Sequence, residues 1–508
     1  MGLNPTLKND LENKLRFYIV FFGALFFSQS FGAGGVRCGT MQFAENSKNA
    51  GIKSLAKSGC VPENYYGRVL ERKTEHFIIY YTQEKVHAIK TPYFIDSLAK
   101  YLEQAYKLHT GSLGMKGISG ASQTYHYKKN VPDNLYPIEV LDLGLLRDLE
   151  GEYATAFGIT FTQSAPWKTQ IAIENDFLYG ADCQGNYSTK PFKTIKGVDY
   201  SKEWYLALKV TVFHELYHSF QMMQLSISEN RTFWLEASAT GVEEIGAPEV
   251  NDYINYLPAV FSNPGISIEN SDGDRDYGYA ILYLFLFSEL GPRFDSAIWS
   301  YFSRYPKEKF SAQLTRLVDS LRRIDKIDMD SEELFHKFAS QVFYSGQRAA
   351  FSPSQPYWKD MPEWPEWRLK QSIPSVLPAG AFDFIIRASG DEPPDMGSLV
   401  KIDSLNYGDS SVWVLSRSLE KPSTPSLAKG VFAAYPNPWN PTLYPKIHFK
   451  NTGGANVEIR SANGALLKRI NKNSEDSWDW EPPKKPAPGI LYYRTLPYGK
   501  NKVLIVEY

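Results

Sequence analysis

Helical spacing of apolar residues is clearest in the middle of the chain. It runs without proline or glycine from 204 to 224, which predicts a long helix with a buried face. After a polar connection, residues 232–246 predict a second helix, rich in alanine and glutamate and ended by a glycine. Two Leu- and Phe-rich stretches predict further helices, at 279–290 and 332–342.

Short β-rich runs precede this helical half. Residues 76–81, 136–144 and 170–177 predict strands, and the amphipathic stretch 97–109 predicts a helix between the first two. Strands followed by helices indicate an α+β fold in which a mixed sheet comes before the long helix.

The sequence pattern changes at Phe351. Helical periodicity stops, and residues 351–425 combine a Pro- and Trp-rich stretch with two strand-like runs, AFDFIIRA and SVWVLS. We interpret them as a small β-rich connecting module or an elaborate linker. The tryptophans either pack against the preceding domain or form a sugar-stacking surface, and packing is the favoured interpretation. From residue 430 to 508, short strands alternate with turn signals, a pattern that predicts a small β-sandwich.

The first 32 residues have the features of a secretory signal peptide. Basic residues precede an apolar run from 17 to 27, and small residues follow it, so cleavage after either Ser30 or Gly32 fits. The alternative is a membrane anchor, but the run is too short for a permanent span, and no other stretch reaches transmembrane length. We therefore expect an exported protein, secreted or at the cell surface.

Composition narrows the function further. The 508 residues are 43% hydrophobic, enough for two or three domains, and the net charge of −1 gives no electrostatic case for binding nucleic acid or an anionic membrane. The chain has three cysteines, an odd number for an exported protein. Cys38 and Cys60 bracket a short loop and either form a disulfide, leaving Cys183 alone, or all three are reduced thiols.

The predicted helix at 204–224 carries the pattern H-E-x-x-H. His214 and His218 lie one turn apart on one helical face, where both imidazoles reach one metal ion. Glu215 projects beside them, in the position of a carboxylate that takes a proton from water on the metal. The simpler interpretation of the motif is two ordinary core histidines.

The second helix decides between these interpretations. Glu236 follows His218 by 18 positions, counted as 236 − 218, and is flanked by apolar residues. A carboxylate in an apolar setting needs a partner, because burying it alone is costly. A zinc ion held by two histidines and one glutamate supplies that partner and keeps a fourth position open. An exposed helical glutamate is the alternative.

H-E-L-Y-H followed by W-L-E-A-S-A-T resembles the gluzincin, or thermolysin-like, zinc metallopeptidases. It is most similar to a group of secreted bacterial metalloproteases that carry the W-L-E-A-S-A-T helix. The resemblance implies a zincin-like catalytic domain over residues 36–350, in which a sheet and a helical half flank the active site. It also implies Zn²⁺ ligands at His214, His218 and Glu236, with Glu215 as general base.

The same resemblance implies that an edge strand of the sheet binds an extended peptide, and both 156–161 and 171–175 fit that place. This chain departs from thermolysin in lacking a suitable downstream histidine to stabilise the oxyanion. Tyr277 and Tyr279 are the candidates for that role, with Arg275 as a further donor, although both tyrosines also fit simple packing.

Polar residues around the motif suggest two further roles. Thr240 and Glu243 share a helical face with Glu236 and are candidates to orient the ligands, or are solvated positions. The loop that leads to Tyr277 contains three alternating aspartates, Asp272, Asp274 and Asp276. They fit loop and helix-capping positions better than a calcium site, because the glutamate and the spacing of an EF-hand are missing.

The segment 430–508 resembles the immunoglobulin-like sorting domains of exported bacterial proteins. The similarity rests on Y-P-N-P-W-N-P, W-D-W and P-G-I-L-Y-Y-R, which occur in that order. It implies recognition by an outer-membrane secretion machine, such as type IX, in a Gram-negative envelope. The alternative is a structural β-domain without an address function.

These observations together predict an exported zinc peptidase that hydrolyses protein or peptide bonds. Two alternatives stay open. One is a catalytically silent surface protein with a zincin-like fold, although such a protein has no need of Glu215. The other is a zinc hydrolase of non-peptide amides or esters, which would use the same ligands and base.

Overall fold

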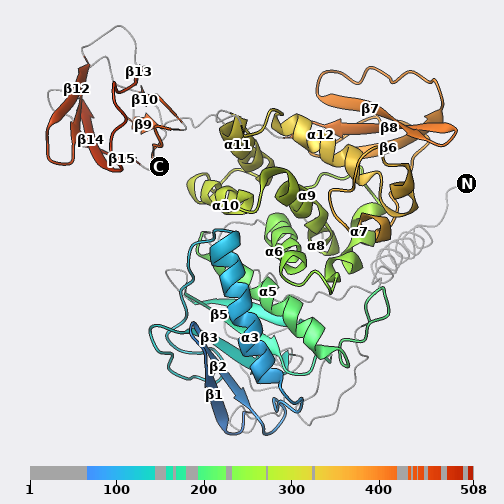
Figure 1. Ribbon diagram of the computed structural model, residues 1–508, viewed down its shortest axis with the longest axis vertical. Helices are drawn as coiled ribbons and strands as arrows, with labels where there is room; N and C mark the ends of the chain where they lie inside the picture. Colours follow the sequence, from blue (N-terminus) through green and yellow to red (C-terminus); the bar gives the residue numbers. More distant parts are fainter. Residues whose placement is uncertain are drawn as a thin grey trace, which may run out of the picture. The chain divides into compact units, whose positions relative to one another are not determined.

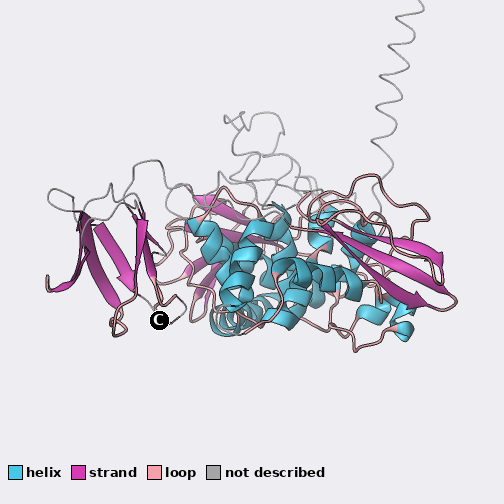
Figure 2. Cartoon of the chain, turned by 90° about the horizontal axis from the view of Figure 1, so that it is seen from above, coloured by secondary structure: helices cyan, strands magenta, loops and turns pink. Residues whose placement is uncertain are grey.

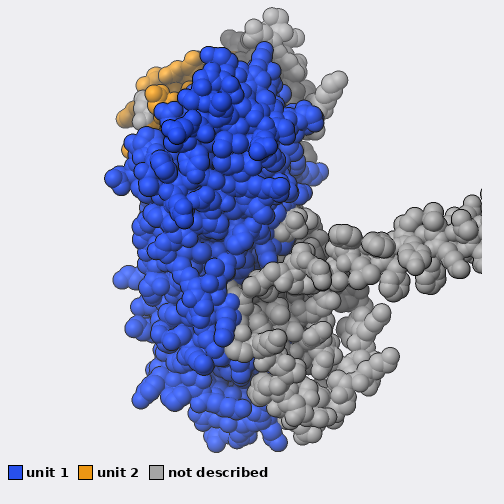
Figure 3. All heavy atoms as spheres, turned by 90° about the vertical axis from the view of Figure 1, so that its right-hand side faces the viewer, with its two compact units in different colours: residues 1–310, 332–420 blue, residues 311–331, 421–508 orange. Residues whose placement is uncertain are grey.

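The structure is a computed structural model of the whole chain (Figure 1). It describes residues 66–143, 156–163, 168–178, 193–224, 232–270, 273–322, 326–419, 433–435, 437, 439–442, 444–450, 456–470, 477–495 and 502–506. The chain divides into two compact units, residues 1–310 with 332–420 and residues 311–331 with 421–508 (Figure 3). It is an α+β protein with a β-rich C-terminal part, as the sequence predicts.

A five-stranded mixed sheet forms one half of unit 1, with strand order β1-β2-β3-β5-β4. β2 and β3 are parallel, as are β3 and β5, whereas β1 and β4 run antiparallel to their neighbours at the two edges. The bounds are Val69–Lys73 (β1), Phe77–Thr82 (β2), Tyr136–Leu141 (β3), Gly158–Gln163 (β4) and Lys168–Glu174 (β5). The sequence left two candidates for the edge strand, 156–161 and 171–175; the first overlaps the edge strand β4, whereas the second lies in β5, inside the sheet.

Two helices cover the sheet. α3 (Phe94–Lys107) and α5 (Trp204–Met222) pack against each other and against its strands (Figure 1). α5 confirms the predicted long helix, but its burial is wider than the periodicity indicates, since the face that carries His214 and His218 is buried too. Polar and ionisable side chains that are buried in this way require hydrogen-bond or charged partners.

The other half of unit 1 is helical (Figure 2). α6 (Thr232–Gly246) has the predicted bounds and packs on α5 and α9. The remaining helices of this half are α7 (Leu257–Phe261), α8 (Asp274–Gly278), α9 (Ala280–Leu290), α10 (Phe294–Arg304) and α12 (Ser331–Val342), with 3-10 turns at Asp252–Tyr256 (η4), Gly346–Phe351 (η5) and Met361–Glu363 (η6); a π-helical turn, Leu108–Ser112 (η2), follows α3.

The Pro- and Trp-rich stretch is part of unit 1, so the expected boundary at 350 falls inside that unit. Trp364 and Trp367 are buried, and Trp367 stacks on Phe261 at a ring distance of 3.9 Å. These two tryptophans therefore pack against the preceding helices, and they are not exposed for stacking on a sugar. A three-stranded sheet follows in the order β6-β8-β7, with bounds Phe382–Ala388 (β6), Val400–Tyr407 (β7) and Ser410–Arg417 (β8).

A buried acid pair joins α6 to this stretch. Burial, and then the Asp360 carboxylate, raise the pKa of Glu244 to about 8, although Lys359 Nζ lies 3.8 Å away and Trp358 Nε1 donates to Glu244 at 3.3 Å. Because the folded state holds this proton more tightly than the unfolded state, Glu244 costs stability as the pH rises from about 4.5 to about 8.

We therefore expect the melting temperature of the protein to fall between pH 5 and pH 8.5, and Glu244→Gln to flatten that fall. The slope assigned to one such group is at most ~1.4 kcal/mol per pH unit. Thermal unfolding of both proteins across this range measures the difference. Parallel curves for wild type and variant would contradict the assignment of the pH dependence to Glu244.

Unit 2 contains α11 (Phe310–Arg322), apart from its first residue, and a β-sandwich. One sheet has the order β13-β10-β9 and the other β12-β11-β14-β15. Phe449 from the first sheet and Leu504 from the second share one buried core, which confirms the predicted sandwich. Strand bounds are Ala433–Tyr435 (β9), Ile447–Lys450 (β10), Val457–Ser461 (β11), Leu466–Ile470 (β12), Ser477–Trp480 (β13), Gly489–Thr495 (β14) and Lys502–Val506 (β15).

Several sequence predictions fall on residues that the structure does not describe. They are the signal peptide at 1–32, the cysteines Cys38, Cys60 and Cys183, and Asp272. Within the described ranges, no helix combines the length and the apolar character that crossing a membrane requires.

Candidate metal centre

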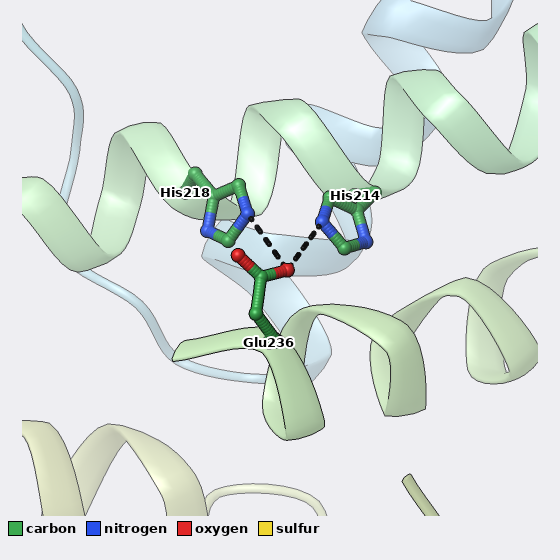
Figure 4. Close-up of side chains that lie close together, drawn as sticks. All are labelled: His214, His218 and Glu236. Carbon is green, nitrogen blue, oxygen red and sulfur yellow. Dashed lines mark ion pairs between the residues drawn. The ribbon is translucent and has the colours of Figure 1, made fainter. Parts of the chain in front are cut away.

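Three buried side chains from α5 and α6 converge on one point (Figure 4). Glu236 Oε2 lies 3.2 Å from His214 Nε2 and 3.6 Å from His218 Nε2, and one ligand atom of each residue lies within 4.8 Å of the others. Tetrahedral zinc with bonds of ~2.0–2.2 Å separates its ligand atoms by about 3.3–3.6 Å. The three residues therefore fit a zinc ion with little movement.

The surroundings of Glu236 also fit a cation. The residue is 2% exposed, and within the described part of the chain neither carboxylate oxygen receives a hydrogen bond. Burial by itself raises the pKa of Glu236, yet the imidazoles of His218 and His214 outweigh burial and hold this pKa at about 2. A buried, ionised carboxylate requires positive charge beside it, and a divalent ion held together with neutral imidazoles would supply that charge.

Each histidine is oriented through its other ring nitrogen. His214 Nδ1 lies 2.6 Å from Glu243 Oε1, and His218 Nδ1 lies 2.7 Å from Gln221 Oε1. When Nδ1 donates to these oxygens, Nε2 of both rings is left as the metal-binding atom. The Gln221 amide in turn donates to Ser238 Oγ on α6 at 2.9 Å, so the ring of His218 is fixed against both helices.

The sequence identified only part of this outer layer. Glu243 is one of the two candidates named for it, whereas Thr240 is fully buried and its hydroxyl has no hydrogen-bond partner among the described residues. Gln221 was not singled out. Its signal is its position three residues after His218, which places it on the same face of α5.

Glu215 lies next to His214 on α5, and a residue of the sheet holds its carboxylate in position. It is 1% exposed, and Thr160 Oγ1 on edge strand β4 lies 2.7 Å from its Oε2 and 2.8 Å from its main-chain oxygen. A Cβ atom at Gly158 would meet Glu215 Cγ at 2.4 Å and Thr211 Cγ2 at 2.7 Å. Glycine at this position is therefore what allows β4 to approach the helix closely enough to hold the carboxylate.

A single carboxylate on α10 connects the two ligand-bearing helices. Asp295 is 1% exposed and accepts hydrogen bonds from Trp234 Nε1 at 2.8 Å, from Trp299 Nε1 at 3.0 Å and from the Tyr217 hydroxyl. Trp234 lies two residues before Glu236, and Tyr217 lies next to a ligand histidine on α5. Burial raises the pKa of Asp295 to about 6. This contact fixes the spacing between the ligands on the two helices.

A small cavity opens beside the ligands. It offers about 20 Å³ to the centre of a water molecule, and ~10–15 Å³ is enough to hold one. Its lining combines three carboxylates, two tyrosines and a ligand histidine, namely Glu215, Glu243, Asp252, Tyr256, Tyr277 and His214. Thr211 and Val210, one turn before the ligand histidine, complete the lining. Glu215 and His214 thus face a space that is large enough for one water molecule.

The structure separates the two tyrosines proposed for the oxyanion. Tyr277 lines the cavity, and its ring stacks on His214 at 6.0 Å and on Tyr256 at 4.8 Å. Tyr279 is not part of that lining. It is fully buried, its hydroxyl accepts a hydrogen bond from Arg275 Nη2 at 3.1 Å, and burial raises its pKa to about 12 even though Arg275 lowers it.

Arg275, the further candidate donor, does not line the cavity either. Its Nη1 donates to the main-chain oxygens of Ala259 and Asn263. Asp274 and Asp276 lie in the first turn of α8, where carboxylates favour a helix N-terminus. Within the described ranges they belong to no cluster of three metal-binding side chains. A second such cluster exists on the surface, at Glu75, His76 and Glu103, where Glu75 is largely exposed.

Comparisons with known proteins add little. No protein-family model matches the chain, and no curated protein matches it either. Among solved structures it is similar to PorZ of Porphyromonas gingivalis, described as an essential bacterial surface component of the type-IX secretion system, with 17% identity over 21% of this chain. The match spans 15% of the PorZ chain at a TM-score of 0.14, which does not establish a common fold.

Proposed function

We propose that this chain is an exported zinc peptidase of the gluzincin type. The observation that carries the proposal is the buried cluster of His214, His218 and Glu236, together with a cavity that both His214 and Glu215 line. Two histidines and one carboxylate, with an open position and a neighbouring glutamate, are the features of a catalytic zinc site. A purely structural zinc site normally has four protein ligands and needs no base.

The reaction assigns each group a role. Zinc, when bound, polarises the scissile carbonyl and lowers the pKa of its water to ~7. Glu215 takes the proton from the attacking water and returns it to the leaving amine. Thr160 keeps the carboxylate of Glu215 directed toward the cavity through the 2.7 Å contact, and Glu243 and Gln221 keep both imidazoles in the ligand orientation.

Tyr277 is the residue that we propose to stabilise the oxyanion. It lies on the cavity wall next to a ligand histidine, and a phenol O–H is a suitable donor to charge that develops on a carbonyl oxygen. Substrate would bind along β4. This strand pairs with β5 on one side and is the last of its sheet, so an extended peptide can add to it by main-chain hydrogen bonds.

The location of the protein follows from its two ends. The basic and apolar residues at 1–32 direct export, and we propose that the C-terminal sandwich is a sorting domain. The protein would then reach the cell surface or the medium through an outer-membrane secretion machine. Protein or peptide substrates at that location are the partners that we propose for the active site.

Metal removal tests the proposal. We expect the purified protein to carry about one zinc ion per chain and to cleave casein, to lose cleavage when a chelator removes the metal, and to regain it when zinc is added back. Metal analysis and a casein assay measure both. A protein that does not bind zinc after reconstitution would instead support the silent surface protein, and one that binds zinc and hydrolyses only esters or non-peptide amides would support the other hydrolase.

A further inference from the structure

The larger sheet of the C-terminal sandwich has exposed apolar side chains on its outer face. This sheet has the strand order β12-β11-β14-β15 (Figure 1). In the described part of the chain, eleven large apolar side chains are exposed, and five of them lie in this one sheet, namely Leu466, Leu467, Ile490, Val503 and Ile505. Exposed apolar residues that gather on one surface indicate contact with another molecule.

The strand register places four of the outward side chains next to one another. Ile490 lies opposite Ile505, and Tyr492 lies opposite Val503, on the neighbouring strands β14 and β15. Residues that are opposite in an antiparallel pair share one face of the sheet, with Cβ atoms ~4.5–5.5 Å apart. Tyr492 is in turn opposite Arg460 on β11. The four side chains therefore form a continuous apolar strip that ends at an arginine.

An arginine cluster adjoins this strip on the same face. Glu458 on β11 lies opposite both Arg469 on β12 and Arg494 on β14. Its carboxylate accepts hydrogen bonds from Arg469 Nε at 3.0 Å, from Arg494 Nη2 at 3.1 Å and from Arg460 Nη2 at 3.1 Å. The guanidinium groups cover Glu458, whereas the side chain of Arg469 is itself 52% exposed. One buried carboxylate thus holds three cations in fixed positions at the surface.

The outer face carries a net positive charge. Three arginines against one glutamate give +2, counted as 3 − 1, and the four strands contain no other acidic residue. The two lysines of these strands lie opposite core residues and therefore belong to the other face. Because the whole chain has a net charge of −1, the positive charge is a local property. It is complementary to a surface that combines carboxylates with apolar side chains.

The composition of this face favours a protein as its partner. Protein interfaces are enriched in arginine and tyrosine and depleted in lysine, and every cation on this face is an arginine. Anionic membranes attract clusters of ~4–8 lysines and arginines, which exceeds the three present here. Two copies of the chain would repel each other through this face, since both carry the same charge. Arginines that are already oriented also lose less conformational entropy on binding.

We infer that the outer face of this sheet is a docking surface for a protein that presents carboxylates beside apolar side chains. The inference rests on the proposed sorting role of the sandwich and is independent of the peptidase proposal. The partner is the part of the outer-membrane secretion machine that receives the sandwich. Arg469 and Arg494 bind its carboxylates, and Val503 and Ile505 pack against its apolar side chains.

Export by living cells tests the inference. The full chain would be produced in a bacterium that has a type IX secretion machine, and immunoblots would measure the protein outside the cells and in the periplasm. The test variant combines Arg469→Gln, Val503→Thr and Ile505→Thr. It leaves two arginines on Glu458 and keeps β-branched residues in β15, so the sandwich should stay folded. Because truncation of central interface residues weakens binding by more than tenfold, we expect export to slow by at least ~10-fold.

Two matched variants control for charge and for apolar surface. Lys446→Gln removes an exposed cation of the sandwich outside these four strands, and Val376→Thr removes an exposed valine of unit 1. Both should be exported as wild type is, and thermal unfolding should be the same for all variants. Export of the triple variant at the wild-type rate would overturn the docking surface and leave the sorting role intact. Retention of the wild-type protein inside the cells would overturn both.

Binding to the purified secretion machine, in detergent, tests the nature of the partner. Because salt screens charge pairs at a surface, we expect the Kd of the full-length wild-type protein to rise by ~3-fold or more from low to high salt. Arg469→Gln should reduce that salt dependence, whereas Val503→Thr with Ile505→Thr should weaken binding equally at both salt concentrations. A wild-type Kd that does not change with salt would overturn the assignment to carboxylates.

Two other occupants of the face would be recognised by their own measurements. If wild type binds phosphatidylglycerol vesicles but not the purified machine, and the triple variant does not bind the vesicles, the occupant is an anionic lipid. If wild type sediments as a dimer and the triple variant as a monomer, the occupant is a second copy of the chain. Either result would overturn the assignment to the secretion machine.

Discussion

Replacing Glu215 with glutamine is expected to abolish peptide hydrolysis while zinc stays bound. Glutamine has the size of glutamate and accepts a hydrogen bond from Thr160 as glutamate does, but its amide cannot take a proton from water. Positioned general bases contribute about 10²–10⁴-fold to rate, and we expect kcat/KM to fall by that amount. Initial-rate assays on casein or a fluorogenic peptide, together with metal analysis, measure both effects.

Zinc content serves as the internal control for this variant. Glu215 is not one of the three converging ligands, so its replacement leaves the ligand set complete. Activity within a few-fold of wild type in a zinc-loaded Glu215→Gln protein would refute the role of Glu215 as base. Loss of zinc along with activity would instead place Glu215 among the ligands, outside the cluster of three side chains that the structure brings together.

Replacing Glu236 with alanine is expected to remove the metal. Changes in the outer layer of zinc sites cost ~10–100-fold in metal affinity, and a direct ligand exceeds the upper end of that range. Because a bound ion stabilises the folded state by about 2.7 kcal/mol at 100 times its Kd, we expect the wild-type melting temperature to fall when a chelator is added. Glu236→Ala should be inactive and insensitive to chelator.

Two variants control for misfolding. Glu236→Gln keeps the size of the side chain and should also lose zinc, since a neutral amide is a poor zinc ligand. Glu244→Gln changes another buried glutamate of α6 and should keep zinc and activity. Stoichiometric zinc in a folded Glu236→Ala protein would eliminate the third ligand and with it the gluzincin assignment.

Local sequence pattern was enough to predict which three side chains come together in the structure, His214, His218 and Glu236. H-E-x-x-H needs only the geometry of one helix, and Glu236 was recognisable because apolar neighbours surround a charge. The bounds of α5 and α6 also follow from spacing, glycine and proline. The histidine spacing, the apolar neighbours of Glu236 and the helix ends each depend on residues within about one helical turn, so they can be recognised in a single sequence.

Contacts between distant segments were not readable in the same way. Thr160 reaches Glu215 across 55 positions, and Asp295 reaches Tyr217 across 78. Nothing in the sequence around these residues indicates the pairing, because it depends on how β4 and α10 pack on α5. Tyr277 and Tyr279 show the same limit. They are two residues apart, Tyr277 inside α8 and Tyr279 just after its end, and they have different surroundings, which only the fold determines.

The hydrogen bonds that converge on Asp295 have a consequence for how the proposed site would acquire an ion. Trp234 and Tyr217 attach the third-ligand helix and the histidine helix to one carboxylate, so the distance between them is set by the protein itself. Many small zinc domains fold only around their metal. If the proposed site does bind zinc, these hydrogen bonds would keep the two helices in place before the ion arrives, and the protein could then be made and exported without metal and become active when it first meets zinc.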